Sequence, residues 1–248
     1  MRNDSNIFDV GYVTKELEKN PFTNVSKIVS DAVEDAILKM RLKPGEKLII
    51  SNIASQLGIS TTPVREAIDR LAEKGLIKIE LNDTGKQSIY RVFKITMLEV
   101  EDLFFVRKAI EPASAYYCAE HPWLIDLEKL EDLARKFYSG YVLYDKTRDK
   151  SLLIKTTKLD REFHKLIVNA TNSKVLIETY KSIEKKLTYL TAVTGNEVSD
   201  YSVKNLVKIG HQHVAISNAI KNGFTGEAKL LMNEHLNFCM NINRKSFD

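Results

Sequence analysis

Cysteine is scarce in this chain of 248 residues, which contains only Cys118 and Cys239. The two lie far apart and match no zinc-binding or redox spacing, which argues against a cysteine-based metal site. We expect both to be small buried side chains in a reducing cytoplasm.

Long apolar runs are also missing. No stretch approaches the length that spans a bilayer, and the first twenty residues lack the apolar core of a signal peptide. The five prolines are not expected to interrupt any helical pattern. The net charge of +4 has only a slight basic bias towards residues 23–94, so charge alone does not indicate a nucleic-acid partner. With 44% apolar and 28% charged residues, the chain reads as globular and free of membrane segments.

What is present is a pattern for a helix-turn-helix between Gly58 and Leu76. Four apolar residues recur at helical spacing there and predict one buried face: Val64, Ala67, Ile68 and Leu71. Thr62 is predicted to cap this helix, with Pro63 at its first position and Gly75 just past its end. Arg65 and Arg70 lie on other faces of the helix, where they can contact DNA.

The flanking residues complete a winged helix-turn-helix over residues 23–94. An apolar stripe from Val25 predicts a helix that ends before Lys43-Pro44-Gly45, and Ser51 is predicted to cap a second short helix. After Leu76, the runs IKIEL and SIYRVF predict a hairpin. Residues 1–22 precede this domain as an arm, either loose or with a short helix.

Residues 95–248 are helical almost throughout, so the fold class is mainly α. Thr96 and Glu99 have the spacing of a capping box. The periodicity predicts an antiparallel bundle of about six helices, with approximate bounds 96–120, 126–146, 150–170, 173–193, 201–221 and 225 to the end.

Four polar residues in this bundle fall on faces that should point inwards: Asp160, His164, His213 and His235. Asp160 and His164 are four residues apart, so their side chains project together. Burying such groups is costly unless they pair or bind a metal, and one carboxylate with three imidazoles suits Zn²⁺, Ni²⁺ or Mn²⁺. Spacing alone leaves two interpretations open, a metal site and satisfied core packing.

The N-terminal domain resembles that of GntR-family bacterial transcription regulators. The shared residues are Pro44, Gly45, Leu48, Ala54, Leu57, Gly58, Ser60, the run Thr62 to Ala67, Leu71, Gly75 and Leu76. Two positions depart from the family pattern, because Ile50 replaces an acidic residue and Thr61 replaces an arginine that commonly contacts DNA. The resemblance implies that Arg65 contacts DNA and that Gly85 and Lys86 form the wing tip near the minor groove. The DNA-binding set is then Thr61, Thr62, Pro63, Arg65, Arg70, Gly85 and Lys86.

The C-terminal domain resembles the FCD domain of the FadR-type subgroup. The matching residues are Val106, Arg107, Glu111, Asp160, Phe163, His164, Asn172, His213, Ala219, Ile220, Ala228, Met232, His235 and Leu236. This resemblance implies that Asp160 and the three histidines hold a metal and that a small organic acid binds beside it. Gln212 stands where the family often has glutamate, and we expect it to touch no metal ligand.

Two further residues are candidates for the effector site. Arg107 can grip a carboxylate through two parallel bonds, or pair with Glu111 four residues on. Tyr189 can reach the cavity or be a core aromatic. Cys239 lies four residues after His235, but we do not expect it to bind the metal.

These observations predict a cytoplasmic, ligand-responsive transcription regulator, a repressor rather than an activator and not an enzyme. It would act as a homodimer on double-stranded operator DNA with two related half-sites, and respond to a small carboxylate. Two alternatives stay open: a sensor of the metal itself, and a metal-dependent hydrolase, against which no nucleophile, general base or glycine-rich loop stands out.

Overall fold

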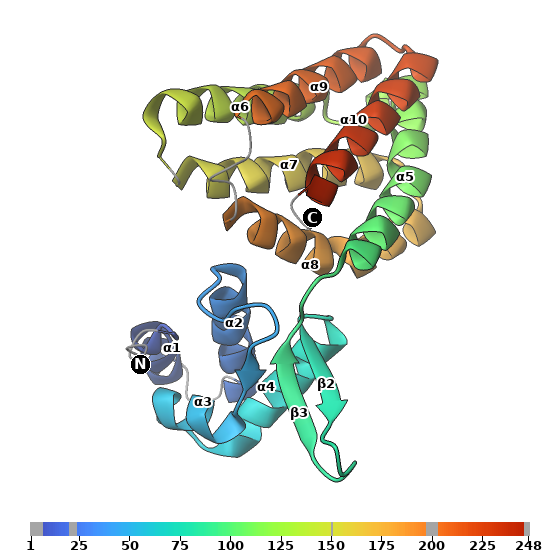
Figure 1. Ribbon diagram of the computed structural model, residues 1–248. Helices are drawn as coiled ribbons and strands as arrows, with labels where there is room; N and C mark the ends of the chain where they lie inside the picture. The colour runs from blue at the N-terminus through green and yellow to red at the C-terminus, as the bar shows by residue number, and fades with distance from the viewer. Residues whose placement is uncertain (1–6, 20–23, 150, 197–202, 246–248) are drawn as a thin grey trace. The chain divides into compact units, whose positions relative to one another are not determined.

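The structure is a computed structural model that describes residues 7–19, 24–149, 151–196 and 203–245 (Figure 1). The chain divides into two compact units, residues 1–95 and residues 96–248. Each unit is described by itself.

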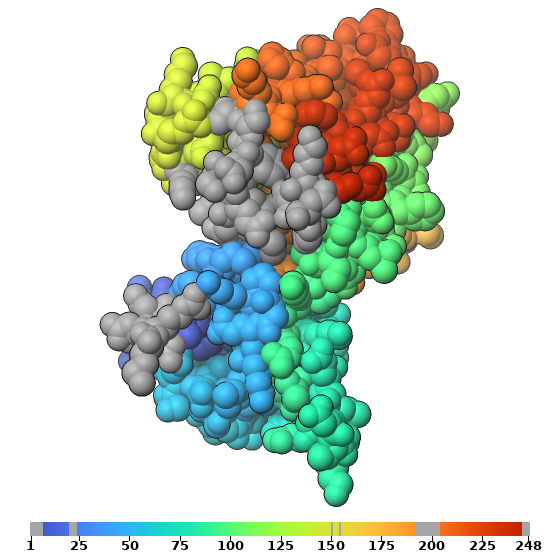
Figure 2. All heavy atoms as spheres, in the orientation of Figure 1, coloured from blue at the N-terminus to red at the C-terminus, as the bar shows by residue number. Residues whose placement is uncertain are grey.

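The N-terminal unit is a winged helix-turn-helix, as predicted. Its described helices are α1 (Val10–Lys19), α2 (Val25–Leu38), α3 (Ile50–Leu57) and α4 (Thr61–Glu73). Its antiparallel sheet has the order β1 (Lys47–Leu48), β3 (Ser88–Val92), β2 (Ile77–Leu81), with Ile79 opposite Tyr90. The hairpin β2–β3 is the wing, which projects as a narrow ridge (Figures 1 and 2).

The apolar stripe of the sequence becomes the core of this unit. The helix α2 begins after Asn24, whose side chain accepts a hydrogen bond from the backbone N–H of Lys27. Val33 and Ile37 of α2 and Ile68 of α4 are fully buried, and α2 packs on α4. Buried Phe8 and Val13 attach α1 to this core, so the segment expected as an arm contains a packed helix.

The predicted caps of the two short helices are wrong, although the glycine stops are right. The helix α4 begins at Thr61 after Ser60, and α3 begins at Ile50 after Ile49, so neither Thr62 nor Ser51 is a cap. Pro63 therefore occupies the third helical position, where a missing N–H still costs no helical hydrogen bond. Gly58 (φ 66°) and Gly75 (φ 72°) adopt the left-handed conformation after α3 and α4.

The C-terminal unit is an antiparallel helical bundle, as predicted. Its described α-helices are α5 (Met97–Glu120), α6 (Leu127–Thr147), α7 (Ser151–Ala170), α8 (Lys174–Asn196), α9 (Val203–Lys221) and α10 (Thr225–Lys245), with the short 3₁₀ helix η1 (Pro122–Leu124) before α6. The most extensive packing joins α5 to α10 and α6 to both α7 and α9 (Figure 1). The expected helix starts near residues 150 and 201 lie outside the described residues.

The capping box at the start of α5 is confirmed. The backbone N–H of Thr96 donates to Glu99 Oε2 (2.7 Å), and the backbone N–H of Glu99 donates to Thr96 Oγ1 (3.4 Å). As expected, no proline interrupts a helical pattern among the described residues, because α5 continues unbroken through the buried Pro112. A proline removes one backbone hydrogen bond, and the packing of α5 against α10 and α7 stabilises the helix there.

No helix among the described residues is long and apolar enough to cross a membrane.

Candidate functional site

The first candidate site is a groove between the start of α4 and the wing. Thr61 and Arg65 of α4 line it together with Lys86 and Gln87 of the wing, and Lys47 and Ser51 contribute from the segment around β1 and α3. All six side chains are exposed. A helix with cationic and hydroxyl groups beside a basic wing has the form of a DNA-reading surface.

The other predicted DNA contacts lie around this groove. Thr62 is exposed next to Thr61, and Pro63 is half-buried. Arg70 is exposed in the last turn of α4 and is not among the described groove residues. Sequence reasoning missed Lys47, Ser51 and Gln87, because their approach to α4 depends on the pairing of β1 with β3.

The wing tip owes its shape to Asn82. Its side-chain oxygen accepts hydrogen bonds from the backbone N–H groups of Lys86 (3.0 Å) and Gln87 (3.2 Å). Gly85 turns the chain with φ 69°, which only glycine adopts readily. The exposed Lys86 is thereby presented at the tip.

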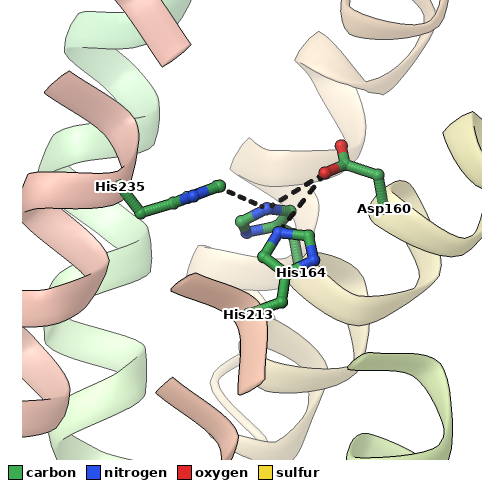
Figure 3. A group of neighbouring side chains, drawn as sticks. All are labelled: Asp160, His164, His213 and His235. Atoms are coloured by element: carbon green, nitrogen blue, oxygen red, sulfur yellow. Dashed lines mark hydrogen bonds and ion pairs between the residues drawn. The ribbon is translucent and has the colours of Figure 1, made fainter. Parts of the chain in front are cut away.

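The second candidate site is the predicted group of four in the C-terminal unit. Asp160 and His164 from α7 meet His213 from α9 and His235 from α10 (Figure 3). One ligand atom from each lies within 4.8 Å of all the others. The three histidines are at most 1% exposed, whereas a quarter of the Asp160 side chain is accessible.

His164 is oriented by a buried carboxylate. Glu111 Oε2 lies 2.7 Å from His164 Nδ1, off the direction of a good hydrogen bond, and Asp160 Oδ1 lies 3.7 Å from Nε2. Glu111 also accepts hydrogen bonds from Arg107 Nε (2.5 Å) and Nη2 (3.2 Å). Burial by itself would raise the pKa of Glu111, but the charges of Arg107 and His164 outweigh it and hold the pKa at about 2.

His235 is oriented by the side chain of Gln212. Gln212 Oε1 lies 3.1 Å from His235 Nδ1 and can only accept a hydrogen bond from it. In a neutral imidazole this leaves Nε2 unprotonated. The expectation that Gln212 touches no metal ligand is therefore wrong. Gln212 lies on α9 and His235 on α10, so only helix packing brings them together.

His213 is fully buried and stacks on Phe163 (ring centroids 4.3 Å apart) and against Phe137 (4.3 Å). Neither ring nitrogen has a hydrogen-bond partner among the described residues, although Nε2 lies 3.4 Å from Asp160 Oδ1. Burial lowers the pKa of His213 to about 3, despite the attraction of Asp160. The imidazole is therefore neutral, the form that binds metals.

These contacts fit a divalent cation. His164 Nε2 and His235 Nε2 face each other at 3.2 Å, which is hydrogen-bond distance. Burial by itself would lower the pKa of His164, but the charge of Glu111 outweighs it and raises the pKa, so a divalent ion bound between the two nitrogens would replace a proton there. Two nitrogens that each lie about 2.1 Å from one ion can be as close as this. The orphaned nitrogens of His213 and the low pKa of Asp160 complete a donor set of one carboxylate and three imidazoles.

A cavity of about 120 Å³ adjoins this cluster. Asp160, His164 and His235 line it together with Arg107. Arg107 is paired with Glu111, which was one of the two interpretations that its sequence position allowed. Tyr189 is fully buried and is not among the described lining residues. Sequence reasoning missed Arg161, a lining residue next to Asp160 on α7.

Cys239 also lines the cavity, with its Sγ 3.7 Å from His235 Nε2. Burial raises the pKa of its thiol well above the ordinary range. That Cys239 does not bind a metal stays a prediction.

Comparisons with known proteins match both units. Residues 26–82 match "Bacterial regulatory proteins, gntR family", and residues 102–238 match the "FCD domain". The HTH-type transcriptional repressor RspR of Escherichia coli (strain K12) is 24% identical over 90% of this chain and 91% of its own length. The Nta operon transcriptional regulator of Aminobacter aminovorans is 25% identical over 69% of this chain and 73% of its own.

Solved structures show the same fold. A transcriptional regulator from Rhodococcus sp. RHA1 has a TM-score of 0.70 at 22% identity and covers 91% of this chain and 100% of its own. Escherichia coli McbR has a TM-score of 0.66 at 19% identity, over 92% of this chain and 100% of its own. The matched families and relatives are transcription regulators and not enzymes, which removes the hydrolase alternative. The chain therefore belongs to the GntR family of bacterial transcription regulators and carries an FCD domain in its C-terminal unit.

Proposed function

We propose that this protein is a cytoplasmic repressor that binds operator DNA as a homodimer and is controlled by a small carboxylate. In this proposal its FCD domain holds a divalent transition metal (Zn²⁺, Ni²⁺ or Mn²⁺) on Asp160, His164, His213 and His235. The observation that carries the proposal is the pair of imidazole Nε2 atoms facing each other at 3.2 Å beside the cavity. The metal would supply a Lewis-acidic anchor for an anion.

The charges around the cluster favour an anionic effector. Glu111 neutralises Arg107, so the charge of Asp160 is the carboxylate charge that remains for a metal. A divalent ion on Asp160 and three neutral histidines leaves the site with one positive charge, and Arg161 on the cavity wall adds another. A carboxylate offsets one of these two charges, whereas a neutral ligand would offset neither.

The cavity favours an effector sensor over a sensor of the metal itself. A site that reported only the ion would need no space beside it. Here about 120 Å³ lies against the three cluster residues Asp160, His164 and His235. This supports an organic ligand that reaches the metal.

The proposed DNA contacts centre on Arg65, which faces the groove near Thr61 and Lys86. Thr61 is shorter than the arginine that the family commonly has here, so we propose that Arg65 and the wing supply most of the contact in this region. Thr62, Pro63, Arg70 and Gly85 complete the proposed set.

The proposed dimer surface is the outer stripe of α5. Leu98 is 67% exposed and Phe105 is 76% exposed, and they lie seven residues apart on one face of α5. The exposed Tyr116 follows about three turns further along the same stripe. Ala109 and Ala113 lie between them and are also exposed, so a second helix can approach closely. A second copy of this stripe would bury these apolar side chains symmetrically.

The effector would act by favouring an arrangement of the dimer that does not bind DNA. A tenfold loss of operator affinity requires about 1.4 kcal/mol of coupling. One or two charge-assisted hydrogen bonds that form in only one arrangement are of this size.

The test is thermal unfolding of the full chain against a panel of small carboxylates, with and without chelation. A ligand at a hundredfold excess over its Kd stabilises by about 2.7 kcal/mol, which raises Tm by roughly 5–10 °C in a domain of this size. We expect one acid to do so, the effect to disappear on chelation, and one metal to restore it.

Two variants serve as controls for this experiment. His213→Ala removes a ligand and should abolish both metal content and the effect of the acid. Asn218→Ala changes an exposed residue of the same helix and should do neither. Full metal occupancy of the His213→Ala protein, or no response of the native protein to any acid, would contradict the proposal.

A further inference from the structure

Arg107, a candidate for the effector site from the sequence, already forms an ion pair with Glu111. Arg107 donates through Nε and Nη2 to Glu111, which is fully buried and cannot move to water without a large cost. Releasing Arg107 for an effector would leave Glu111 unpaired beside His164. The other N–H groups of Arg107 belong to a guanidinium whose charge Glu111 already offsets, so an arginine without a carboxylate partner is the stronger candidate for a second carboxylate.

Arg161 has the properties that Arg107 lacks. Its Nη1 donates to Thr188 Oγ1 (2.6 Å), which holds the guanidinium in place against α8. Its Nε is buried and has no hydrogen-bond partner among the described residues. A buried N–H without an acceptor destabilises the protein, and an entering carboxylate would supply that acceptor with a charge-assisted bond.

The position of Arg161 places this donor beside the cluster. Thr157, Arg161 and His164 line the cavity and follow each other at spacings of four and three residues, so they share one side of α7. A carboxylate between Arg161 and the metal would contact both positive charges of the site and offset one of them.

Tyr141 and Tyr180 also line the wall, and Tyr180 forms a hydrogen bond with Glu111. Three smaller polar side chains donate hydrogen bonds within their own helices. Thr157 donates to the carbonyl of Leu153 (2.8 Å), Thr191 to that of Leu187 (2.8 Å), and Asn243 Nδ2 to that of Cys239 (2.8 Å). The rest of the wall is largely hydrocarbon, from Phe104, Phe137, Leu153, Leu206, Ile209 and Ile242. A hydroxyl placed there would lose water and find no donor in return.

We propose that Arg161, rather than Arg107, receives the effector's carboxylate, and that the effector is a monocarboxylic acid with a compact hydrocarbon body. This inference rests on the proposed effector function. A dry cavity of about 150 Å³ admits benzene, so a cavity of about 120 Å³ suits a body of one ring or a short alkyl chain. Sugar acids, with many hydroxyls, are the wrong class for this wall.

The first arm of the test is calorimetry on the full-length, zinc-loaded protein with acetate, butyrate, hexanoate, benzoate and gluconate. Burial of each methylene should raise affinity about fourfold until the cavity is full. Benzoate should bind at least as well as butyrate, and gluconate should bind no better than acetate. An affinity that does not depend on chain length, or a preference for gluconate, would overturn the proposed ligand class.

The second arm replaces the donor. Arg161→Gln should weaken every acid that binds by about tenfold to a hundredfold, with the zinc content unchanged, because the shared carboxylate loses a charged partner. The affinity of Arg161→Lys for the acids should lie between those of the native protein and Arg161→Gln, since an ammonium keeps the charge but lacks the planar guanidinium. Arg135→Gln removes an exposed arginine of α6 as the matched control and should change nothing.

The outcomes separate the two hypotheses. If the native protein binds acids and Arg161→Gln binds them equally well, the role of Arg161 is refuted while the effector function stands. If the zinc-loaded native protein binds none of the acids, the inference and the proposed effector both fail.

Discussion

The side chain of Gln212 provides a sharp test of the metal site, because it contacts His235 without being a ligand itself. Its Oε1 accepts a hydrogen bond from His235 Nδ1 (3.1 Å), which orients the ring with Nε2 towards the cluster. Removing such a partner typically costs tenfold to a hundredfold in metal affinity, or about 1.4–2.8 kcal/mol. Gln212→Leu should therefore weaken zinc binding by this factor.

The opposite change should strengthen binding. Gln212→Glu keeps the acceptor and adds a negative charge, so His235 becomes a more basic ligand and zinc should bind more tightly than in the native protein. Competition against a chromophoric chelator measures both affinities. Asn218→Asp adds the same charge to an exposed position of α9 and serves as the control. Native affinity in both Gln212 variants would refute the assignment of His235 as a ligand.

Three further predictions concern the DNA-binding surface, the proposed dimer surface and the buried ion pair. Arg65→Ala should weaken operator binding by about 1–3 kcal/mol in fluorescence anisotropy without lowering Tm, and unchanged affinity would remove this exposed residue from the interface. In the same assay the operator affinity of the native protein should fall steeply as the salt concentration rises. Phe105→Glu should shift the protein towards monomer in sedimentation velocity, because it charges the outer stripe of α5, and a dimer that persists would place the interface elsewhere. Glu111→Gln should lower the free energy of unfolding by about 3–5 kcal/mol in urea denaturation, because Arg107 stays buried without its partner, whereas a cost below 1 kcal/mol would mean that water reaches Arg107.

The sequence predicted helices more reliably than their first residues. An apolar stripe persists over several turns, so the existence of α2 or α7 does not depend on any single residue. A helix start depends on one or two backbone angles, and the chain entering α4 from Gly58 reaches helical geometry at Thr61, one residue before the predicted cap. Pro112 does not break α5 for a related reason, because the packing of α5 against α10 stabilises the helix around it.

The sequence by itself determined the winged helix, the helical bundle and the identity of the four inward polar residues, because these follow from periodicity, caps and a long family pattern. Only the tertiary structure decided how those residues are used. Glu111 lies 2.7 Å from His164 across two helices, Gln212 meets His235 across two others, and Arg161 is anchored by Thr188. Such contacts join residues between 23 and 53 positions apart in the chain, so they depend on how helices pack and not on spacing along any one of them. Arg107 and Glu111 lie four residues apart on α5, so the sequence allowed either an effector contact or this ion pair, and the fold forms the pair. Arg161 lines the cavity, and its buried Nε has no hydrogen-bond partner among the described residues.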